Sequence, residues 1–220
     1  MKILLFLGAT LLLAPNLSQA QAAPVPEKAA ICSSCHGIDG NSVVAEYPSL
    51  AGQRALYLQR QLQAFRAAAR SNNKEGRADP IMSNMAAMLS DADITELAQY
   101  YALQPRQQQP GAAADMAQTG QQLYQGGDLS RDIAACAACH GLDGKGMAAA
   151  GFPALLAQHP HYLVEQLQKF KHGERKDDYQ GMMQDTSAKL TEQDMQALAA
   201  YISCCRLINE LLQCLRKRKH

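Results

Sequence analysis

Large aromatic side chains are scarce in this sequence of 220 residues, which contains no tryptophan and only 4 phenylalanines. Small domains bury little apolar surface, so they usually need large apolar side chains or an additional stabilising group, such as a disulfide or a bound metal. The scarcity therefore predicts that something other than side chains fills the centre of each domain.

An excess of one sign of charge is also missing. The 21 Lys and Arg residues nearly balance the 20 Asp and Glu residues, which leaves a formal net charge of +1. Proteins that bind nucleic acid present a basic face, and nothing in the central part of the chain resembles one. We therefore expect no nucleic-acid partner.

The sequence has no apolar run long enough to span a bilayer. The one run near the start, Ile3 to Ala14, is shorter than the about 20 residues that a membrane-spanning helix needs. A lysine precedes it and small residues follow it, which is typical of a secretory signal peptide. We expect this signal over residues 1–22 and a mature protein exported to the periplasm.

What the chain does have is an internal repeat. "ICSSCHGIDGN" at 31–41 returns as "ACAACHGLDGK" at 135–145, 104 residues later. The segment 47–66 matches 152–171, and 89–102 matches 190–203. A polar, Pro-containing stretch lies between the copies and reads as a linker. The expected order is a first domain at 23–103, a linker at 104–111, a second domain at 112–203 and a tail at 204–220.

The local pattern is helical throughout, and no stretch alternates with the period of a strand. Ser90-x-x-Asp93 and Thr191-x-x-Asp194 resemble capping boxes at the start of one helix in each copy. Apolar residues with helical spacing follow both boxes. The fold class we predict is all-α, with two tandem domains.

The C-x-x-C-H units allow three chemical interpretations. A thioredoxin-like redox pair requires a βαβ setting that this sequence lacks. A structural zinc ion needs four ligands, but the first copy offers only Cys32, Cys35 and His36. Covalent haem attachment uses two thiols on the porphyrin edge and the next histidine on the iron. We predict two covalently bound haems c, and the candidate residues are Cys32, Cys35 and His36 in one copy and Cys136, Cys139 and His140 in the other.

Three alternatives remain for the second axial position of each iron: a methionine ligand, a lysine ligand or no protein ligand. With the offset of 101 residues that relates 89–102 to 190–203, Met82 falls on Met183, and no other methionine has a partner. We expect Met82 and Met183 to be the ligands, with Met182 as the nearest rival. We expect Met85, Met88 and Met195 to fill gaps in the core.

Other residues are candidates for supporting roles. Pro48 and Pro153 follow the histidines by 12 and 13 residues, and a backbone carbonyl there can accept the second imidazole N–H. The alternative is that they are simple turn prolines. Tyr57 and Tyr162 are candidates to reach the haem propionates, or they are half-buried helix residues. The histidines without a partner in the first copy are expected on the surface: His159, His161 and His172.

Taken together, the doubled C-x-x-C-H-G-x-D-G units, the "[YF]P-x-L…YL…QL" segments and the methionines before "L-[ST]-[DE]" resemble the di-haem cytochrome c4 family. The resemblance covers about residues 25–203. It implies two cytochrome-c-like domains whose haems face each other across the domain interface. It also implies His/Met ligation, by His36 with Met82 and by His140 with Met183.

The same resemblance implies a periplasmic electron carrier between a quinol-oxidising cytochrome bc complex and a terminal oxidase, and not an enzyme. Two alternatives stay open, a haem-bearing electron-transfer subunit of a periplasmic dehydrogenase and a di-haem peroxidase. We expect a monomer. The tail departs from the family: it carries Cys204, Cys205 and Cys214 before a basic end, and it is either an interfacial membrane anchor or an extension without function.

Overall fold

The computed structural model describes residues 24–108 and 116–204. The predicted signal peptide, the last residues of the predicted linker and the tail beyond Cys204 lie outside the described residues. In the described parts of the chain, no helix is both long enough and apolar enough to cross a membrane.

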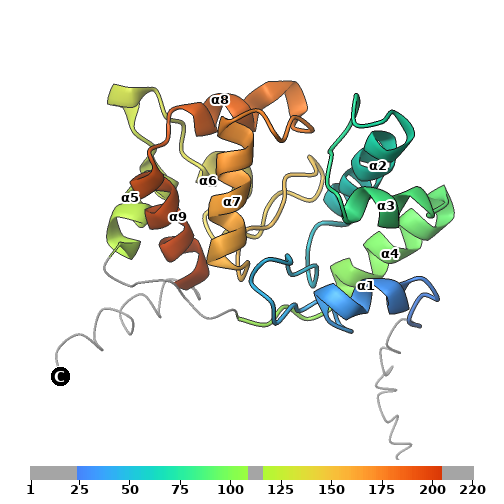
Figure 1. Ribbon diagram of the computed structural model, residues 1–220. Helices are drawn as coiled ribbons and strands as arrows, with labels where there is room; N and C mark the ends of the chain where they lie inside the picture. Colours follow the sequence, from blue (N-terminus) through green and yellow to red (C-terminus); the bar gives the residue numbers. More distant parts are fainter. Residues whose placement is uncertain (1–23, 109–115, 205–220) are drawn as a thin grey trace, which may run out of the picture.

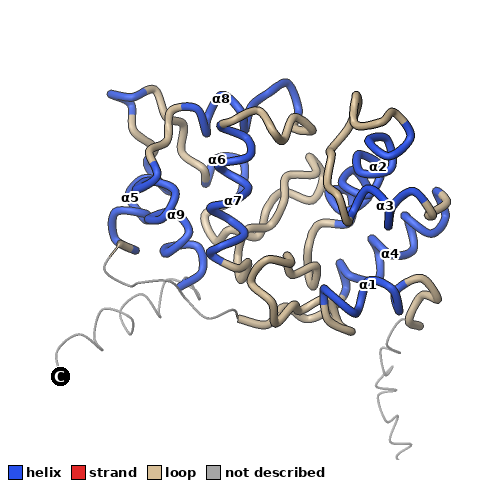
Figure 2. Tube along the Cα trace, viewed as in Figure 1, coloured by secondary structure: helices blue, strands red, loops and turns tan. Residues whose placement is uncertain are grey.

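Two groups of helices stand side by side, with long loops filling the space between them (Figure 1). The described residues contain no strand, as Figure 2 shows, and only two isolated bridges. The prediction of an all-α fold is therefore confirmed. The first half contains α1 (Ala29–His36), α2 (Ala55–Arg70), α3 (Met82–Ala87) and α4 (Asp91–Leu103). The second contains α5 (Ala117–Gly126), η1 (Leu129–Arg131), α6 (Ala137–His140), α7 (Pro160–Lys171), η2 (Tyr179–Gly181), α8 (Met182–Ala188) and α9 (Glu192–Cys204).

Both predicted capping boxes are present. Asp93 N–H donates to Ser90 Oγ at 3.1 Å, and Ser90 N–H donates to the Asp93 carboxylate at 2.8 Å. Thr191 and Asp194 repeat both bonds at 3.1 and 2.8 Å. Each box satisfies two backbone N–H groups that a helix start would otherwise leave without partners.

The helices α4 and α9 bury the faces that their apolar spacing predicts. Ile94 and Leu97 are each 1% exposed, and Met195 and Leu198 are 0% and 2% exposed. These faces belong to two separate core clusters, one in each half. The expectation for two other methionines was wrong: Met85 and Met88 are 38% and 60% exposed, because α3 buries Ser83 and Ala86 instead and ends before Met88.

Helix α5 has no counterpart among the described residues of the first half. Counted back by 104 residues it would fall on residues 13–22, within the predicted signal peptide, so the repeat did not predict it. α5 packs against α9, and the contact depends on Gly120. A Cβ at Gly120 would lie 1.9 Å from the Ala197 carbonyl oxygen, so only glycine allows the two backbones to come this close.

The two halves are joined by a pair of reciprocal contacts. Gln53 Nε2 donates to Ala154 O at 2.8 Å, and Ala154 N–H donates to Gln53 Oε1 at 2.7 Å. At the equivalent positions of the repeat, Gln158 makes the same two bonds to the backbone of Ser49, at 3.0 and 2.9 Å. The interface therefore has an approximate two-fold symmetry that follows the repeat.

Candidate functional site

The first cysteine pair lies on the short helix α1. Cys32 and Cys35 are three residues apart, a spacing that places both thiols on one side of a helix, and both are free and half-buried. In the second half, Cys136 is the N-cap of α6 and Cys139 lies inside it. Both of these thiols are also free and half-buried. Each half therefore presents two thiols from one helical segment, next to a histidine.

Each histidine is buried and held by a proline carbonyl. His36 Nδ1 lies 2.8 Å from Pro48 O, and His140 Nδ1 lies 3.0 Å from Pro153 O. Burial lowers the pKa of both imidazoles, although the proline carbonyls act in the opposite direction. A neutral ring that donates from Nδ1 keeps a lone pair on Nε2, which is the atom that a metal ion binds.

A glycine ends each of these helices directly after the histidine. Gly37 and Gly141 have φ of +80° and +79°, a region that favours glycine. At Gly37 a Cβ would also lie 2.5 Å from Asn41 O. The turn lets the chain leave the helix sharply, and the loop that follows returns to place its proline carbonyl against the ring.

The first cysteine of each pair packs on the core. Cys32 contacts the cluster that contains Leu58 and Leu97, and Cys136 contacts the cluster around Leu163. Burial raises the pKa of the Cys32 thiol, and it raises that of Cys136 to about 11. Both thiols are therefore protonated at neutral pH before they react, and neither has the exposed thiolate character of a redox-active cysteine.

Met82 is the first residue of α3, and Met183 is the second residue of α8, after Met182. Met82 N–H donates to Asp79 Oδ1, three residues earlier, at 2.8 Å, and Met183 N–H donates to Asp178 Oδ2, five residues earlier, at 2.7 Å. Four residues further on, Ala86 and Ser187 are both 0% exposed, so the offset of 101 residues relates α3 to α8. Met182, the rival, lies one position before this match.

The candidate tyrosines contact the opposite half of the molecule. Tyr57 OH accepts a bond from Arg175 Nη2 at 3.1 Å, and Tyr162 OH accepts one from Arg77 Nη2 at 3.3 Å. The repeat could not reveal these arginines, because they lie 98 residues apart in a region where the alignment has a gap. The interface glutamines Gln53 and Gln158 are repeated in the aligned segments, but their spacing alone does not indicate an interface.

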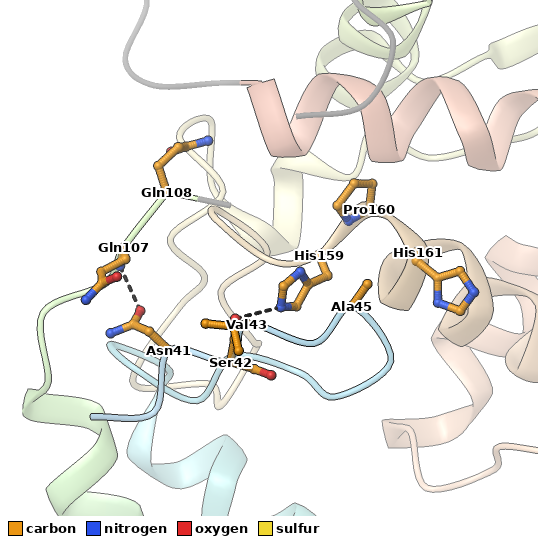
Figure 3. A pocket seen from close by; sticks show the side chains of 9 residues that line it. All are labelled: Asn41, Ser42, Val43, Ala45, Gln107, Gln108, His159, Pro160 and His161. Atoms are coloured by element: carbon orange, nitrogen blue, oxygen red, sulfur yellow. Dashed lines mark hydrogen bonds between the residues drawn. The ribbon is translucent and has the colours of Figure 1, made fainter. Parts of the chain in front are cut away.

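One histidine expected on the surface is buried. His159 is 4% exposed, and its Nε2 lies 3.0 Å from Ser42 O of the first half (Figure 3). It precedes Pro160, the first residue of α7, at the point where α7 meets the loop that follows α1. His161 and His172 are exposed as expected.

A cavity of about 410 Å³ opens beside His159. It is lined by residues 41–43, Ala45, residues 107–108 and residues 159–161. Figure 3 shows mostly loop side chains around it. None of the candidate cysteines and none of the candidate iron ligands lines this cavity.

The residues present fit a covalently bound haem. Each half supplies two free thiols for the porphyrin edge and one fixed, neutral imidazole for the iron. Within the described residues, no three His, Cys, Asp or Glu side chains converge as a site for a bare metal ion. The two thiols and the histidine of each unit therefore do not point at one atom. That separation suits a haem, which takes the thiols at its rim and the imidazole at its centre.

The sequence matches the cytochrome c family twice, over residues 28–102 and again over 117–204. It is 38% identical to cytochrome c4 of Thiocapsa roseopersicina, over 86% of this chain and 94% of that protein. It is 36% identical to the thiosulfate dehydrogenase electron acceptor of Thiomonas intermedia (strain K12), over 82% of this chain and 81% of that protein.

A solved structure has the same architecture. The crystal structure of reduced recombinant cytochrome c4 from Pseudomonas stutzeri superposes with a TM-score of 0.76 at 38% identity, over 80% of this chain and 94% of that one. The two matched domains carry one covalently bound haem c each, which accounts for the scarcity of large side chains in both cores. The chain therefore belongs to the cytochrome c4 family of di-haem c-type electron carriers.

Proposed function

We propose that this chain carries electrons in the periplasm from a quinol-oxidising cytochrome bc complex to a terminal oxidase. The observation that carries the proposal is the near identity of the two haem-holding arrangements, with a histidine bound to a proline carbonyl at 2.8 Å in one half and 3.0 Å in the other. Two equivalent closed sites suit electron transfer. A di-haem peroxidase divides its work between unlike haems.

Each iron is held between two protein ligands. Cys32 and Cys35 attach the first haem, and Cys136 and Cys139 attach the second. His36 and Met82 would bind one iron, and His140 and Met183 would bind the other. The fully buried Ala86 and Ser187, each four residues after the proposed methionine, support this assignment over Met182. A methionine ligand raises the reduction potential, which suits delivery of electrons to an oxidase.

The protein's own residues prepare these sites for electron transfer. The proline carbonyls hold each imidazole in one tautomer and one orientation, so the ring does not reorganise when the iron changes its charge. Burial of each histidine keeps water away from its imidazole ring. The haem supplies the one-electron chemistry, and the contacts between the halves hold the two centres at a fixed separation.

A second candidate function is favoured by one of the relatives. A protein named as a thiosulfate dehydrogenase electron acceptor matches over 82% of this chain. On this reading the same haem sites receive electrons from a dehydrogenase that oxidises a sulfur compound. The chain is then the electron-transfer partner of that enzyme, and catalysis belongs to the other protein.

Reduction kinetics with defined donors separate the two routes. Purified oxidised holoprotein is mixed with membranes that contain a bc complex and a quinol, or with a thiosulfate dehydrogenase and thiosulfate. We expect fast reduction by the first donor, and reoxidation by membranes that contain a terminal oxidase. If only the dehydrogenase reduced the protein rapidly, the second candidate function would replace the first.

Carbon monoxide tests whether the irons are closed. A reduced iron with two protein ligands resists carbon monoxide, and an open site binds it readily. We expect the spectrum of the reduced native protein to stay unchanged when the gas is added. Rapid binding of carbon monoxide at one haem, together with enzymatic turnover of peroxide, would show that the protein is a peroxidase and not an electron carrier.

A further inference from the structure

The helices α2 and α7 begin with unlike residues at equivalent positions of the repeat. Arg54 is the N-cap of α2 and His159 is the N-cap of α7, and the offset of 105 residues that relates 47–66 to 152–171 matches them. Neither side chain caps its own helix. Each one instead crosses the domain interface to the loop that follows the C-x-x-C-H unit of the opposite half.

His159 contacts the loop behind the first C-x-x-C-H unit. The residue is 4% exposed, and its Nε2 lies 3.0 Å from the carbonyl oxygen of Ser42, which is 1% exposed (Figure 3). The Ser42 hydroxyl lies 3.0 Å from Cys35 O and 3.1 Å from Val44 O. A single residue, Ser42, thus connects His159 to the segment that carries the first cysteine pair.

Arg54 makes the corresponding contact in the other direction. Its Nε donates to Lys145 O at 2.6 Å, and its Nη2 lies 3.4 Å from Gly146 O. Gly146 stands one residue beyond the second matched unit, as Ser42 does beyond the first, and its N–H donates to His140 O at 2.8 Å. In each half, a side chain from across the interface therefore reaches the C-x-x-C-H segment through one residue.

The two contacts differ in charge. An arginine side chain is always charged, whereas an imidazole changes its charge within the physiological pH range. Since the Ser42 carbonyl can only accept, the neutral ring of His159 donates from Nε2, and protonation then occurs at Nδ1. The hydrogen bond to Ser42 O is kept in both states, so the contact persists while its charge changes.

The surroundings of His159 allow this change. Burial lowers the pKa of its imidazole, although the Ser42 carbonyl and the Glu46 carboxylate act in the opposite direction. The cavity of about 410 Å³ beside the ring has room for water, which can deliver the proton. His161 lines this cavity from α7, and the linker residues at 107 and 108 that line it are uncharged glutamines.

We propose that His159 and Arg54 are positioning residues, each for the haem site of the opposite half, and that they give the two haems different responses to pH. In acid, His159 takes up a proton from water and adds a positive charge beside the first haem site. Such a charge stabilises the reduced iron, which carries one positive charge less than the oxidised iron. The charge of Arg54 beside the second site stays constant.

The pH dependence of the two reduction potentials tests this role. Purified holoprotein is titrated spectroelectrochemically between about pH 5 and 8, and haem methyl signals in NMR spectra assign each potential to one haem. We expect the potential of the first haem to rise as the pH falls, with about a threefold change in the ratio of oxidised to reduced iron at a fixed electrode potential. The potential of the second haem should stay constant. The test depends on the haems and not on the electron donor or acceptor, so a different electron route leaves it unchanged.

Exchanging the two residues separates a titrating charge from a structural contact. His159→Arg places the residue of the first half in the second, and it should hold the potential of the first haem near its acid value at every pH. Arg54→His should make the potential of the second haem rise in acid as well. His161→Gln is the matched control, because His161 is an exposed histidine beside the same cavity. Its pH profile should equal that of the unmodified protein.

Several results would contradict the proposal. A pH dependence that persists in His159→Arg would show that another group titrates and that His159 has only a structural role. A pH dependence that His161→Gln removes would assign the titration to His161. A constant potential of the second haem in Arg54→His would overturn the role of Arg54. If His159→Arg does not accumulate as holoprotein, the unmodified protein still decides: potentials of both haems that do not change with pH would overturn the proposal.

Discussion

Gln53 and Gln158 stand at equivalent positions of the two halves, and each binds the backbone of the opposite half through two hydrogen bonds of 2.7–3.0 Å. Both side chains are buried, at 7% and 6% exposure. When a side-chain amide donates to and accepts from the backbone of the same residue, the two hydrogen bonds fix both the distance and the relative orientation of the two segments. The two glutamines therefore hold the halves in one relative position, and with it they fix the separation of the two haem sites.

Removing either glutamine should loosen the interface. Gln53→Ala leaves the N–H and C=O of Ala154 buried without partners, which costs about 1–3 kcal/mol for each unsatisfied group. We expect unfolding in urea to change from one transition to two as the halves lose their coupling. Gln63→Ala, on the exposed side of α2, is the control and should behave as the unmodified protein. A single unchanged transition in Gln53→Ala would show that the halves are held elsewhere.

The axial methionines can be identified by absorption. Oxidised His/Met haems show a weak band near the red edge that reports the bond between sulfur and ferric iron. Met82→Ala and Met183→Ala should each remove about half of this band, since each closes one of two haems. Met182→Ala should leave the band intact. Loss of half of the band in Met182→Ala, and not in Met183→Ala, would move the assignment by one residue.

The haem content should fall by half when one cysteine pair is removed. Cys32→Ser combined with Cys35→Ser takes away both attachment points of the first haem and leaves the second pair intact. We expect one haem per chain instead of two, measured from the ratio of haem to protein. The first half should also lose stability, because a cofactor bound only to the folded state stabilises it. Ser34→Ala, on the exposed side of α1, should retain two haems.

The crossing of α5 and α9 should tolerate no side chain at Gly120. Because the added Cβ would lie 1.9 Å from Ala197 O, Gly120→Ala must push the helices apart, and we expect a loss of about 1–3 kcal/mol in the free energy of unfolding. Gly126→Ala lies in the same helix, with no atom within 4 Å of the new Cβ. This control should gain about 0.5–1 kcal/mol, from the helix preference of alanine. Equal stabilities would contradict the close approach of the two helices.

His159 should make the interface sensitive to acid. Burial lowers the pKa of its imidazole, although the Ser42 carbonyl and the Glu46 carboxylate act in the opposite direction. In the unfolded chain the pKa is about 6.5, so below that pH the unfolded state binds more protons than the folded state. Stability is therefore greatest above about pH 6.5 and falls as the pH is lowered through the folded-state pKa.

The sensitivity is measured as the free energy of unfolding between about pH 5 and 8. His159→Gln should flatten the acid side of this profile, and His172→Gln, at an exposed position, should not. An unchanged profile in His159→Gln would assign the acid sensitivity to other groups.

The repeat determined much of this protein without any structure. Two copies of C-x-x-C-H predicted two haems, because covalent attachment needs thiols and an imidazole adjacent in the chain. The capping boxes and the apolar spacing behind them predicted α4 and α9, since helix starts and buried faces depend on residues within a few turns. The offset between the copies selected Met82 and Met183 as the pair of candidate ligands.

Contacts between distant residues could be decided only by the tertiary structure. The alignment treated His159 as a surface residue because it has no counterpart, but the loop after α1 covers it. It did not find Arg77 and Arg175, which meet only when the halves dock. Helix α5 was missed because it lies outside the segments that the repeat aligns. Local sequence patterns reflect contacts between residues that are close in the chain, whereas an interface is formed by residues that become neighbours only after folding.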